Sequence, residues 1–575
     1  MQAFDVSRKQ VKSYMKKHNR LILTILISCT VLLTSCKTAD RPVLRHNVLV
    51  PDYDVSADEY AGGEGSFGGE FSQETQYEKK SSYMIYYGAL DRDIIENAKQ
   101  YELVILHPRM GNITREQVQE IRSSGTIVLG YISIGEDLRT AGLSPEDMLN
   151  DSRYTGDKTG PRVDPRTAGD TTFDNVDPLG KPSDAGVGYA SYYLDDNDHN
   201  GKPDINPIFN CAFTNIGDPA WYDVLLDMTI DGEDGIPGIR EILDEDYGRG
   251  LGCDGLFLDT IDTCAPNSYT SEADVNMTRF EWTATGVKDF TKRLKKDYPD
   301  KYILQNRGIF FYNPYLPHYK YNPRHFVDYV MYESFMLDSN STSAFNENYY
   351  GDNRYNYAPK LMAEAERPDG FQVLSLGYAE GPEEYELKAS LMGNSKKGLD
   401  LLLEDMKVAE NETGFMHYIT DGGVTLVNNF VLEHQTKKDK KAPHWTSVYN
   451  DSTEWPPGAP TPRIGIGEAV SAEGGITVRW DVALDKNGVE YVLYYQKEPF
   501  DLSEDPELSK AESVVLKPKV GDGYENGDLL HTFPFQDKVT GLEKGTKYYL
   551  IIRARDRSKA QNEEGNAVVL TAVAG

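Results

Sequence analysis

Eight short apolar segments, rich in β-branched and aromatic residues and each followed by helical or turn sequence, are the feature that most limits the fold. They are Tyr83–Tyr87, Leu103–His107, Ile127–Ile134, Leu256–Leu258, Tyr302–Gln305, Tyr329–Tyr332, Val373–Gly377 and Phe415–Ile419. Helical periodicity is clearest at Arg115–Arg122, Phe280–Leu294 and Leu399–Ala409. Continuous apolar strands that alternate with helices are typical of parallel sheets buried on both faces. The pattern predicts an α/β fold, a (β/α)8 TIM barrel; a doubly wound sheet also alternates, but eight strands without a glycine-rich first turn favour the barrel.

The spacing of these segments also predicts where the chain divides. The third and fourth segments are much further apart than the others, so we expect a long insertion at 140–250, on the rim where such loops shape a cleft. The barrel is predicted to span 81–435. A linker at 436–462 follows, first basic and then proline-rich, and the proline-rich part should act as a stiff spacer.

The last part of the chain, 463–575, changes to the alternating pattern of half-buried strands. It contains Trp480 and the segment 542–548, Leu-Glu-Lys-Gly-Thr-Lys-Tyr. These features resemble a fibronectin type III domain, which implies an all-β sandwich. Such a module most often spaces or docks a catalytic domain, and sugar binding is the alternative.

The N-terminus has the pattern of an export signal. Six basic residues precede an apolar run, and they are Arg8, Lys9, Lys12, Lys16, Lys17 and Arg20. The run, Leu21–Leu33, is too short to cross a bilayer as a stable helix, so 1–35 is predicted to be a signal peptide. The sequence Leu33-Thr34-Ser35-Cys36 resembles the bacterial lipobox, which implies cleavage before Cys36 and diacylglycerol attachment to its sulfur; the alternative is an ordinary signal peptide with a chance cysteine. With a glycine-rich tether at 36–80, the chain is predicted to be exported and membrane-anchored, at the cell surface or the periplasmic face.

Charge and cysteine content exclude some functions. The net charge is −31, and because residues 1–35 carry +5, the mature chain would have −36. Such a surface repels phosphate backbones, so nucleic acid is not an expected partner, whereas a cationic substrate would be attracted. Of the later cysteines, Cys211, Cys253 and Cys264, any two could form a disulfide, and their spacing indicates neither a zinc site nor an active-site thiol.

Carboxylates, amides and tyrosines follow the predicted strands, where βα loops converge. In chain order these are Tyr131, Glu136, Arg139, Asp259, Asp262, Gln305, Asn306, Arg307, Glu333, Tyr378, Glu380 and Asp421. Such a rim, without a metal motif or a nucleophile elbow, suits carbohydrate chemistry. Glycoside hydrolysis needs two carboxyl groups at one glycosidic oxygen, and Asp259 and Glu333 are the candidates. The alternative for each is a loop cap or a structural ion pair.

Four segments carry a more specific resemblance. They are 131–139 (Tyr-Ile-Ser-Ile-Gly-Glu-Asp-Leu-Arg), 253–262 (Cys-Asp-Gly-Leu-Phe-Leu-Asp-Thr-Ile-Asp), Gln305-Asn306 and Tyr332-Glu333-Ser334. They are similar to motifs of glycoside hydrolase family 114, the endo-α-1,4-polygalactosaminidases and their relatives, over most of 82–430. The resemblance implies that Asp259 and Glu333 are catalytic and that Tyr131, Glu136 and Arg139 shape sugar subsites. The remaining predicted substrate-binding residues are Asp262, Gln305, Asn306, Tyr332 and Tyr378. One departure is His107-Pro108, where members often carry an acid.

The predicted function is therefore that of an endo-acting glycoside hydrolase that cleaves a polysaccharide. The family resemblance and the negative charge together imply that this polysaccharide is cationic and rich in galactosamine. Glu333 is expected to be the general acid and Asp259 the nucleophile or base, although the roles could be reversed. The alternatives are a polysaccharide-binding lipoprotein without turnover and a glycosidase for another sugar. No cofactor is expected for catalysis.

A second type of site is predicted inside the insertion. The segment 196–204, Asp-Asn-Asp-His-Asn-Gly-Lys-Pro-Asp, places Asp196, Asp198, Asn200 and Asp204 at positions 1, 3, 5 and 9, with glycine at position 6. This is the first part of a calcium loop, and it resembles the loops of dockerins and thrombospondin repeats. Position 12 is Pro207 and not the usual glutamate. We expect a structural calcium ion, and the alternative is an acidic surface turn.

Overall fold

The computed structural model describes residues 80–575 with gaps, of which the longest are 267–279, 336–352, 379–408, 432–439, 450–459 and 521–532. The predicted signal peptide, Cys36, nearly all of the tether, Glu380 and most of the predicted helix Leu399–Ala409 lie outside the described residues. Among the described residues, no helix is both long and apolar enough to cross a membrane.

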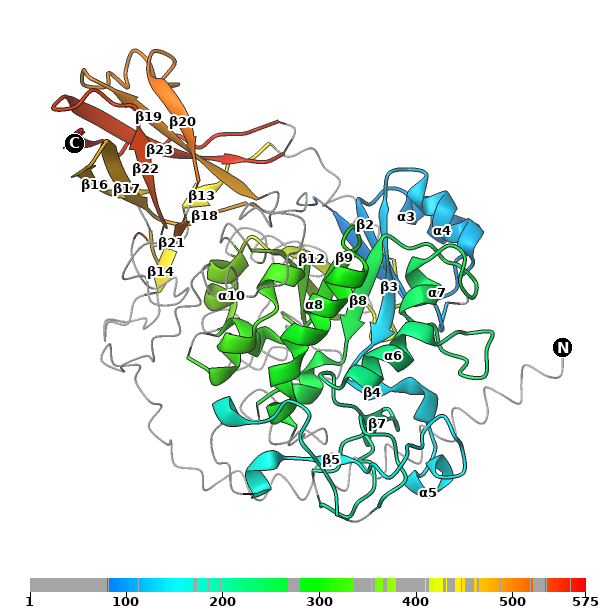
Figure 1. Cartoon of the computed structure of the whole chain (residues 1–575). Coiled ribbons are helices and arrows are strands. Elements are labelled where there is room, and N and C mark those ends of the chain that lie inside the picture. Colours follow the sequence, from blue (N-terminus) through cyan, green and yellow to red (C-terminus); the bar gives the residue numbers. More distant parts are fainter. Residues whose placement is uncertain are drawn as a thin grey trace, which may run out of the picture. The chain divides into compact units, whose positions relative to one another are not determined.

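Eight parallel strands form the central sheet of the chain, in the order β1-β2-β3-β8-β9-β10-β11-β12 (Figure 1). Their bounds are β1 Tyr83–Tyr86, β2 Leu103–Leu106, β3 Ile127–Ser133, β8 Gly255–Asp259, β9 Tyr302–Asn306, β10 Tyr329–Glu333, β11 Gln372–Tyr378 and β12 Met416–Thr420. The first and last strands contact each other, and just beyond them the Tyr87 N–H donates to the Val424 carbonyl at 2.7 Å. The sheet therefore comes close to full closure, and the prediction of an eight-stranded parallel β/α fold is confirmed.

The strands are apolar throughout because both of their faces are covered. Every residue of β2 is buried, and so is every residue of β12. Helices cover the outer face, among them α3 Arg92–Ala98, α4 Arg115–Arg122, α8 Val287–Asp297 and α10 Ala358–Ala365 (Figure 1). Thr114 and Gln117 form a reciprocal capping box at the start of α4, as predicted for a helix over this range. The predicted helix Phe280–Leu294 is shorter, because Glu281–Gly286 forms a 3₁₀ segment before α8 begins.

The insertion between β3 and β8 has short elements of its own. These are β4 Glu136–Asp137, α5 Pro145–Met148, β5 Arg162–Val163, β6 Lys181–Pro182, β7 Ala212–Phe213, α6 Pro219–Asp227 and α7 Ile239–Leu243. Strand β4 pairs with β7, which brings residues about 75 positions apart beside each other at the rim. Helix α7 contacts β3 and β8, so the end of the predicted insertion belongs to the helical layer of the barrel.

The last part of the chain forms two antiparallel four-stranded sheets, in the orders β16-β17-β22-β21 and β20-β19-β23-β24. Their bounds are β16 Ile466–Ala472, β17 Gly475–Trp480, β19 Val489–Gln496, β20 Glu512–Leu516, β21 Lys519–Val520, β22 Phe535–Thr540, β23 Lys547–Asp556 and β24 Leu570–Val573. Trp480 is fully buried, and the Tyr548 hydroxyl accepts the Glu543 N–H at 3.1 Å. An all-β region is thus confirmed, while its assignment to the fibronectin type III family stays a prediction. The three described cysteines, Cys211, Cys253 and Cys264, are buried free thiols.

Candidate active site

Three neighbouring strands of the barrel end in side chains that meet at the carboxyl-terminal rim. Strands β8, β9 and β10 lie side by side and end at Asp259, Asn306 and Glu333. In each case the next residue is not glycine and yet has a positive φ, which is 65° at Thr260, 55° at Arg307 and 57° at Ser334. L-residues adopt this conformation at an energetic cost, and such strain is concentrated at functional sites.

The amide of Asn306 joins the two carboxylates. Its Nδ2 donates to Asp259 Oδ1 at 2.8 Å and to Glu333 Oε2 at 2.7 Å, so these two oxygens are at most 5.5 Å apart. The structure thus brings together three residues that the sequence placed at the ends of consecutive strands. Since both amide hydrogens are used on carboxylates, Asn306 fixes the spacing of the pair.

Glu333 is the carboxyl group of the pair that favours its protonated form. Burial raises its pKa, and the nearby charge of Asp259 raises it further. Hydrogen bonds from Asn306 and from the Tyr378 hydroxyl oppose this rise by favouring the ionised form. Glu333 thus holds a proton more readily than an ordinary glutamate, as the acid of a carboxyl pair requires.

Arg307 and Asp262 connect the turns that follow these strands. The Arg307 Nε donates to Asp262 Oδ2 at 2.5 Å, and its Nη1 donates to the main-chain carbonyl of Glu333 at 3.1 Å. Asp262 also accepts the Gly308 N–H at 2.9 Å. These contacts make Asp262 a positioning residue for the carboxylate pair in this structure.

Aromatic rings form one wall of the site. Tyr131 on β3 stacks on His107, with ring centroids 4.1 Å apart and planes at 17°. Tyr87 meets Tyr131 edge-on at 5.5 Å, and its pKa is raised by burial and then by the charges of Asp259 and Glu333. Burial, with a smaller contribution from Arg109, lowers the pKa of His107 to about 3, so this ring is neutral at neutral pH. Tyr87 was not predicted to be a site residue, although this tyrosine ends the first apolar segment.

Glu136 lies beside this wall on β4 and has one unpaired oxygen. The side chain is only 4% exposed, and its Oε1 accepts the Asn206 amide at 2.7 Å. Its Oε2 has no hydrogen-bond partner among the described residues. Burial raises the pKa of Glu136 to about 7, and the charge of Asp259 adds to this rise. The carboxyl group borders a pocket whose lining includes His107, Tyr131, Ser133, Glu136, Trp221 and Met228.

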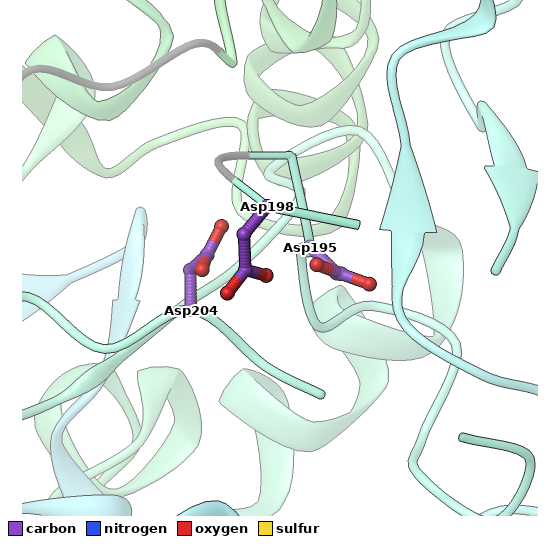
Figure 2. Close-up of side chains that lie close together, drawn as sticks. All are labelled: Asp195, Asp198 and Asp204. Atoms are coloured by element: carbon purple, nitrogen blue, oxygen red, sulfur yellow. The ribbon is translucent and has the colours of Figure 1, made fainter. Parts of the chain in front are cut away.

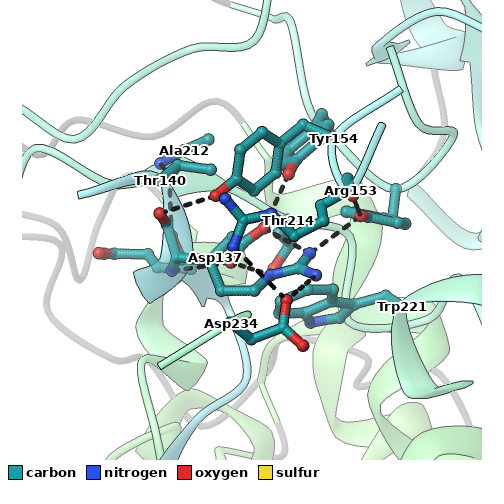
Figure 3. A network of polar contacts seen from close by, with 12 residues as sticks. Asp137, Thr140, Arg153, Tyr154, Ala212, Thr214, Trp221 and Asp234 are labelled. Carbon is teal, nitrogen blue, oxygen red and sulfur yellow. Dashed lines mark hydrogen bonds and ion pairs between the residues drawn. The ribbon is translucent and has the colours of Figure 1, made fainter. Parts of the chain in front are cut away.

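A separate network of polar contacts surrounds Asp137 (Figure 3), and Arg139 belongs to it through its hydrogen bond to Asp137. Its side chain is 4% exposed and donates to Asp137 at 2.8 Å, and the rings of Tyr154 and Trp221 lie 5.5 and 5.7 Å from the guanidinium carbon. Asp234 approaches it at 3.6 Å. These contacts hold the insertion together, so the structure gives Arg139 a packing role, and its part in sugar binding stays a prediction.

Two predicted site residues face away from the carboxylate pair because side chains alternate along a strand. Gln305, one residue before Asn306, is fully buried and donates to the Arg307 carbonyl at 2.8 Å. Tyr332, one residue before Glu333, is also buried and donates to Asn353 Oδ1 at 2.6 Å. At the last strand, Asp421 accepts N–H groups of its own loop, from Thr425 and Leu426, and so acts as a turn cap.

The predicted calcium loop gathers a different set of carboxylates from the one expected. Asp195, Asp198 and Asp204 offer ligand atoms that all lie within 4.8 Å of one another. Asp196 is not part of this group among the described residues. Asn200 uses its amide within the loop, where its Nδ2 donates to Asp198 at 2.7 Å and its Oδ1 accepts the Lys202 N–H at 2.8 Å.

Comparisons with known proteins show distant structural neighbours. No protein-family model matches the chain, and no curated protein matches it. The glycoside hydrolase domain of PelA from Pseudomonas aeruginosa is 16% identical, with 60% of this chain and 97% of that chain covered and a TM-score of 0.34. The maltogenic α-amylase AmyB from Thermotoga neapolitana is 9% identical, with 83% and 99% covered and a TM-score of 0.32. The trehalose-6-phosphate hydrolase of Bacillus licheniformis is 13% identical, with 53% and 58% covered and a TM-score of 0.27. Because these TM-scores are low, the chemistry of the site is inferred from its own side chains and not from these neighbours.

Proposed function

We propose that this protein is an endo-acting glycoside hydrolase that cleaves a polysaccharide with Asp259 and Glu333. The observation that carries the proposal is the carboxylate pair at the barrel rim, bridged by Asn306 through hydrogen bonds of 2.8 and 2.7 Å. A general acid and a nucleophile or base must flank the same glycosidic oxygen in such an enzyme. The raised pKa of Glu333 suits the acid, because that group must hold a proton when the substrate binds.

The spacing of the pair supports a retaining mechanism. Retaining glycosidases have carboxyl groups about 5–5.5 Å apart, and inverting ones roughly 6.5–9.5 Å. The two oxygens that Asn306 bridges are at most 5.5 Å apart, which agrees with the retaining range. In this mechanism Asp259 attacks the anomeric carbon while Glu333 gives its proton to the leaving oxygen. Glu333 then takes a proton from the water that hydrolyses the glycosyl ester.

For the substrate we propose an amino-sugar polymer that carries free ammonium groups. The chain has a net charge of −31, which attracts polycations over long range. At short range, Glu136 lines a pocket together with His107 and Tyr131, and its Oε2 has no hydrogen-bond partner among the described residues. The pKa of Glu136 is about 7, so the group loses its proton easily near neutral pH. An ammonium group of the substrate would then stabilise the buried carboxylate in place of the proton. Partly deacetylated poly-galactosamine has this chemistry and is the substrate implied by the family resemblance.

Product analysis on two matched polymers tests the substrate. Purified protein should release short galactosamine oligomers from partly deacetylated poly-galactosamine, as detected by mass spectrometry, and few or none from the fully acetylated polymer. The Glu136→Gln variant, which keeps the shape of the side chain, should lose most of this preference, by about tenfold in kcat/KM. An unchanged preference would remove Glu136 from the proposal. Binding of both polymers without products would favour the alternative of a polysaccharide-binding protein without turnover. Activity on a different glycan would contradict the proposed substrate but not the proposed mechanism.

For localisation we propose export and lipid attachment at Cys36. The support is the basic segment, the short apolar run Leu21–Leu33 and the lipobox-like sequence before this cysteine. Wild-type protein should enter the detergent phase and incorporate a labelled fatty acid, and the Cys36→Ala variant should do neither. Label in both proteins would contradict the assignment.

The pH dependence of the Tyr378→Phe variant tests Glu333 as the acid. The Tyr378 hydroxyl donates to Glu333 and so stabilises its ionised form. Without this bond the pKa of Glu333 should rise further, and the acid should stay protonated to higher pH. The alkaline limb of the kcat/KM profile should therefore shift upward by about half to one pH unit. A limb that stays in place or moves to lower pH would show that Glu333 does not set it.

A further inference from the structure

Three aspartates in the insertion form a cluster that the proposed chemistry does not use. Asp195, Asp198 and Asp204 come from a single loop, and their side chains lie close together (Figure 2). One oxygen of each lies within 4.8 Å of the other two. Like charges this close repel one another, and a cation among them would offset the repulsion.

A second observation is the buried, unsatisfied carboxylate of Asp195. This residue is fully buried, and its Oδ2 accepts the Gly201 N–H at 2.6 Å. Its Oδ1 has no hydrogen-bond partner among the described residues. Buried polar atoms in proteins almost always have a partner, and an orphaned carboxylate oxygen is among the most costly exceptions. Asp196 Oδ2 is also buried and without a partner among the described residues, but only Asp195 belongs to the cluster, so its unpaired oxygen supports a ligand there.

The neighbouring Asp196 has different surroundings. Its carboxylate interacts electrostatically with Asp164 and Arg166, whereas that of Asp195 interacts with Asp198 and Asp204. The main-chain N–H of Asp196 donates to Asp204 Oδ2 at 3.0 Å. Successive side chains of an extended segment point to opposite sides, which explains why the loop uses the first aspartate of the pair and not the second. Asp195, and not the predicted Asp196, therefore lies in the cluster of the structure.

We propose that Asp195, Asp198 and Asp204 bind one calcium ion. All three donors are carboxylate oxygens, which suit a hard cation and not zinc or copper. Calcium–oxygen distances of about 2.3–2.6 Å place opposite ligands roughly 4.6–5.2 Å apart, so three oxygens within 4.8 Å fit around one ion. Water and main-chain carbonyls complete the coordination, as is usual for calcium with its six to eight ligands.

The ion would stabilise the segment that supports Glu136. The main chain of Asp204 is bonded to Leu194 and to Phe213, at 2.8 and 3.0 Å. Two residues further along, Asn206 donates to the Glu136 carboxylate at 2.7 Å. Calcium binding therefore fixes the loop from which Asn206 reaches the rim. Binding itself does not depend on the proposed glycosidase activity and can be measured without a substrate.

Calorimetry and thermal unfolding of the full chain test the proposal. After treatment with a chelator and dialysis, wild-type protein should bind one calcium ion per chain, and saturating calcium should raise Tm by about 2–6 °C. The Asp198→Asn variant changes an exposed side chain, so it should fold normally but bind calcium at least about tenfold more weakly. The Asp195→Asn variant should behave in the same way.

The Asp196→Asn variant is the matched control, because it removes a buried carboxylate from the same loop but from outside the cluster. Its calcium affinity should stay within about threefold of wild type. Equal weakening in Asp196→Asn and Asp198→Asn would overturn the ligand assignment. Absence of heat and of any Tm change in wild type at about 10 mM calcium would overturn the site, and an equal shift with magnesium would overturn the choice of calcium.

Discussion

The Glu333→Gln variant should hydrolyse the polysaccharide about 10³-fold more slowly than wild type, a loss of about 4 kcal/mol in transition-state stabilisation. The glutamine amide cannot give a proton to the leaving oxygen, although it keeps the size of the side chain. Steady-state kinetics on the polymer measure the effect, and thermal unfolding checks that the barrel is intact. An aryl glycoside whose leaving group needs no proton should be cleaved by the variant with a much smaller loss.

Two comparisons make this result specific for an acid. The Asp262→Asn variant removes another carboxylate from the same rim and weakens its contact with Arg307, while its amide oxygen can still accept the Gly308 N–H, so it should cost about tenfold or less. An equal loss on the polymer and on the aryl glycoside would show that Glu333 does not act as the acid. Full activity of Glu333→Gln on both substrates would remove the carboxylate pair from the mechanism.

The strands were predictable because each is a continuous apolar run between polar helices. The segment Leu256–Leu258 lies inside β8, Gly255–Asp259, and the other runs end within about two residues of their strands. The order of the strands in the sheet follows from the right-handed β/α connection. The same reasoning explains why Asp259 and Glu333 meet, since carboxyl ends of neighbouring parallel strands share one rim.

Other parts of the site could not be predicted from the positions of the strand ends alone. Gln305 and Tyr332 were expected at the rim beside Asn306 and Glu333, but alternation along the strand turns them into the surrounding structure. The two-residue alternation of side chains along a strand could have predicted these orientations. The pairing of Glu136 with Asn206 across 70 residues could not be read from the sequence, because it depends on how the insertion folds back as β4 and β7.

The surroundings of Arg139 were also beyond the sequence. Asp137 is only two residues away, but the rings that enclose the ion pair come from Tyr154 and Trp221 in the insertion. A motif that places an arginine after a strand therefore does not decide whether the side chain faces a substrate or the interior. The departure at His107 is similar: its stacking on Tyr131 becomes clear only when β2 and β3 lie side by side.

The largest effect is expected for Asp259→Gly, whose activity should fall at least about 10⁴-fold because the proposed nucleophile is lost. The glycine leaves a space next to the anomeric carbon. Azide at high concentration should enter this space and restore part of the rate on an activated aryl glycoside. The glycosyl azide should have the configuration opposite to that of the substrate, since azide attacks from the side that Asp259 occupied.

The Glu333→Ala variant under the same conditions separates the two roles. Here Asp259 still forms the glycosyl ester, and azide then displaces it, so two inversions should give an azide with the configuration of the substrate. The anomeric proton signals of the two products distinguish them by NMR. A retained azide from Asp259→Gly together with an inverted azide from Glu333→Ala would show that Glu333 is the nucleophile. Inverted azide from both variants would show a single displacement and contradict the retaining mechanism that the Asn306-bridged spacing supports.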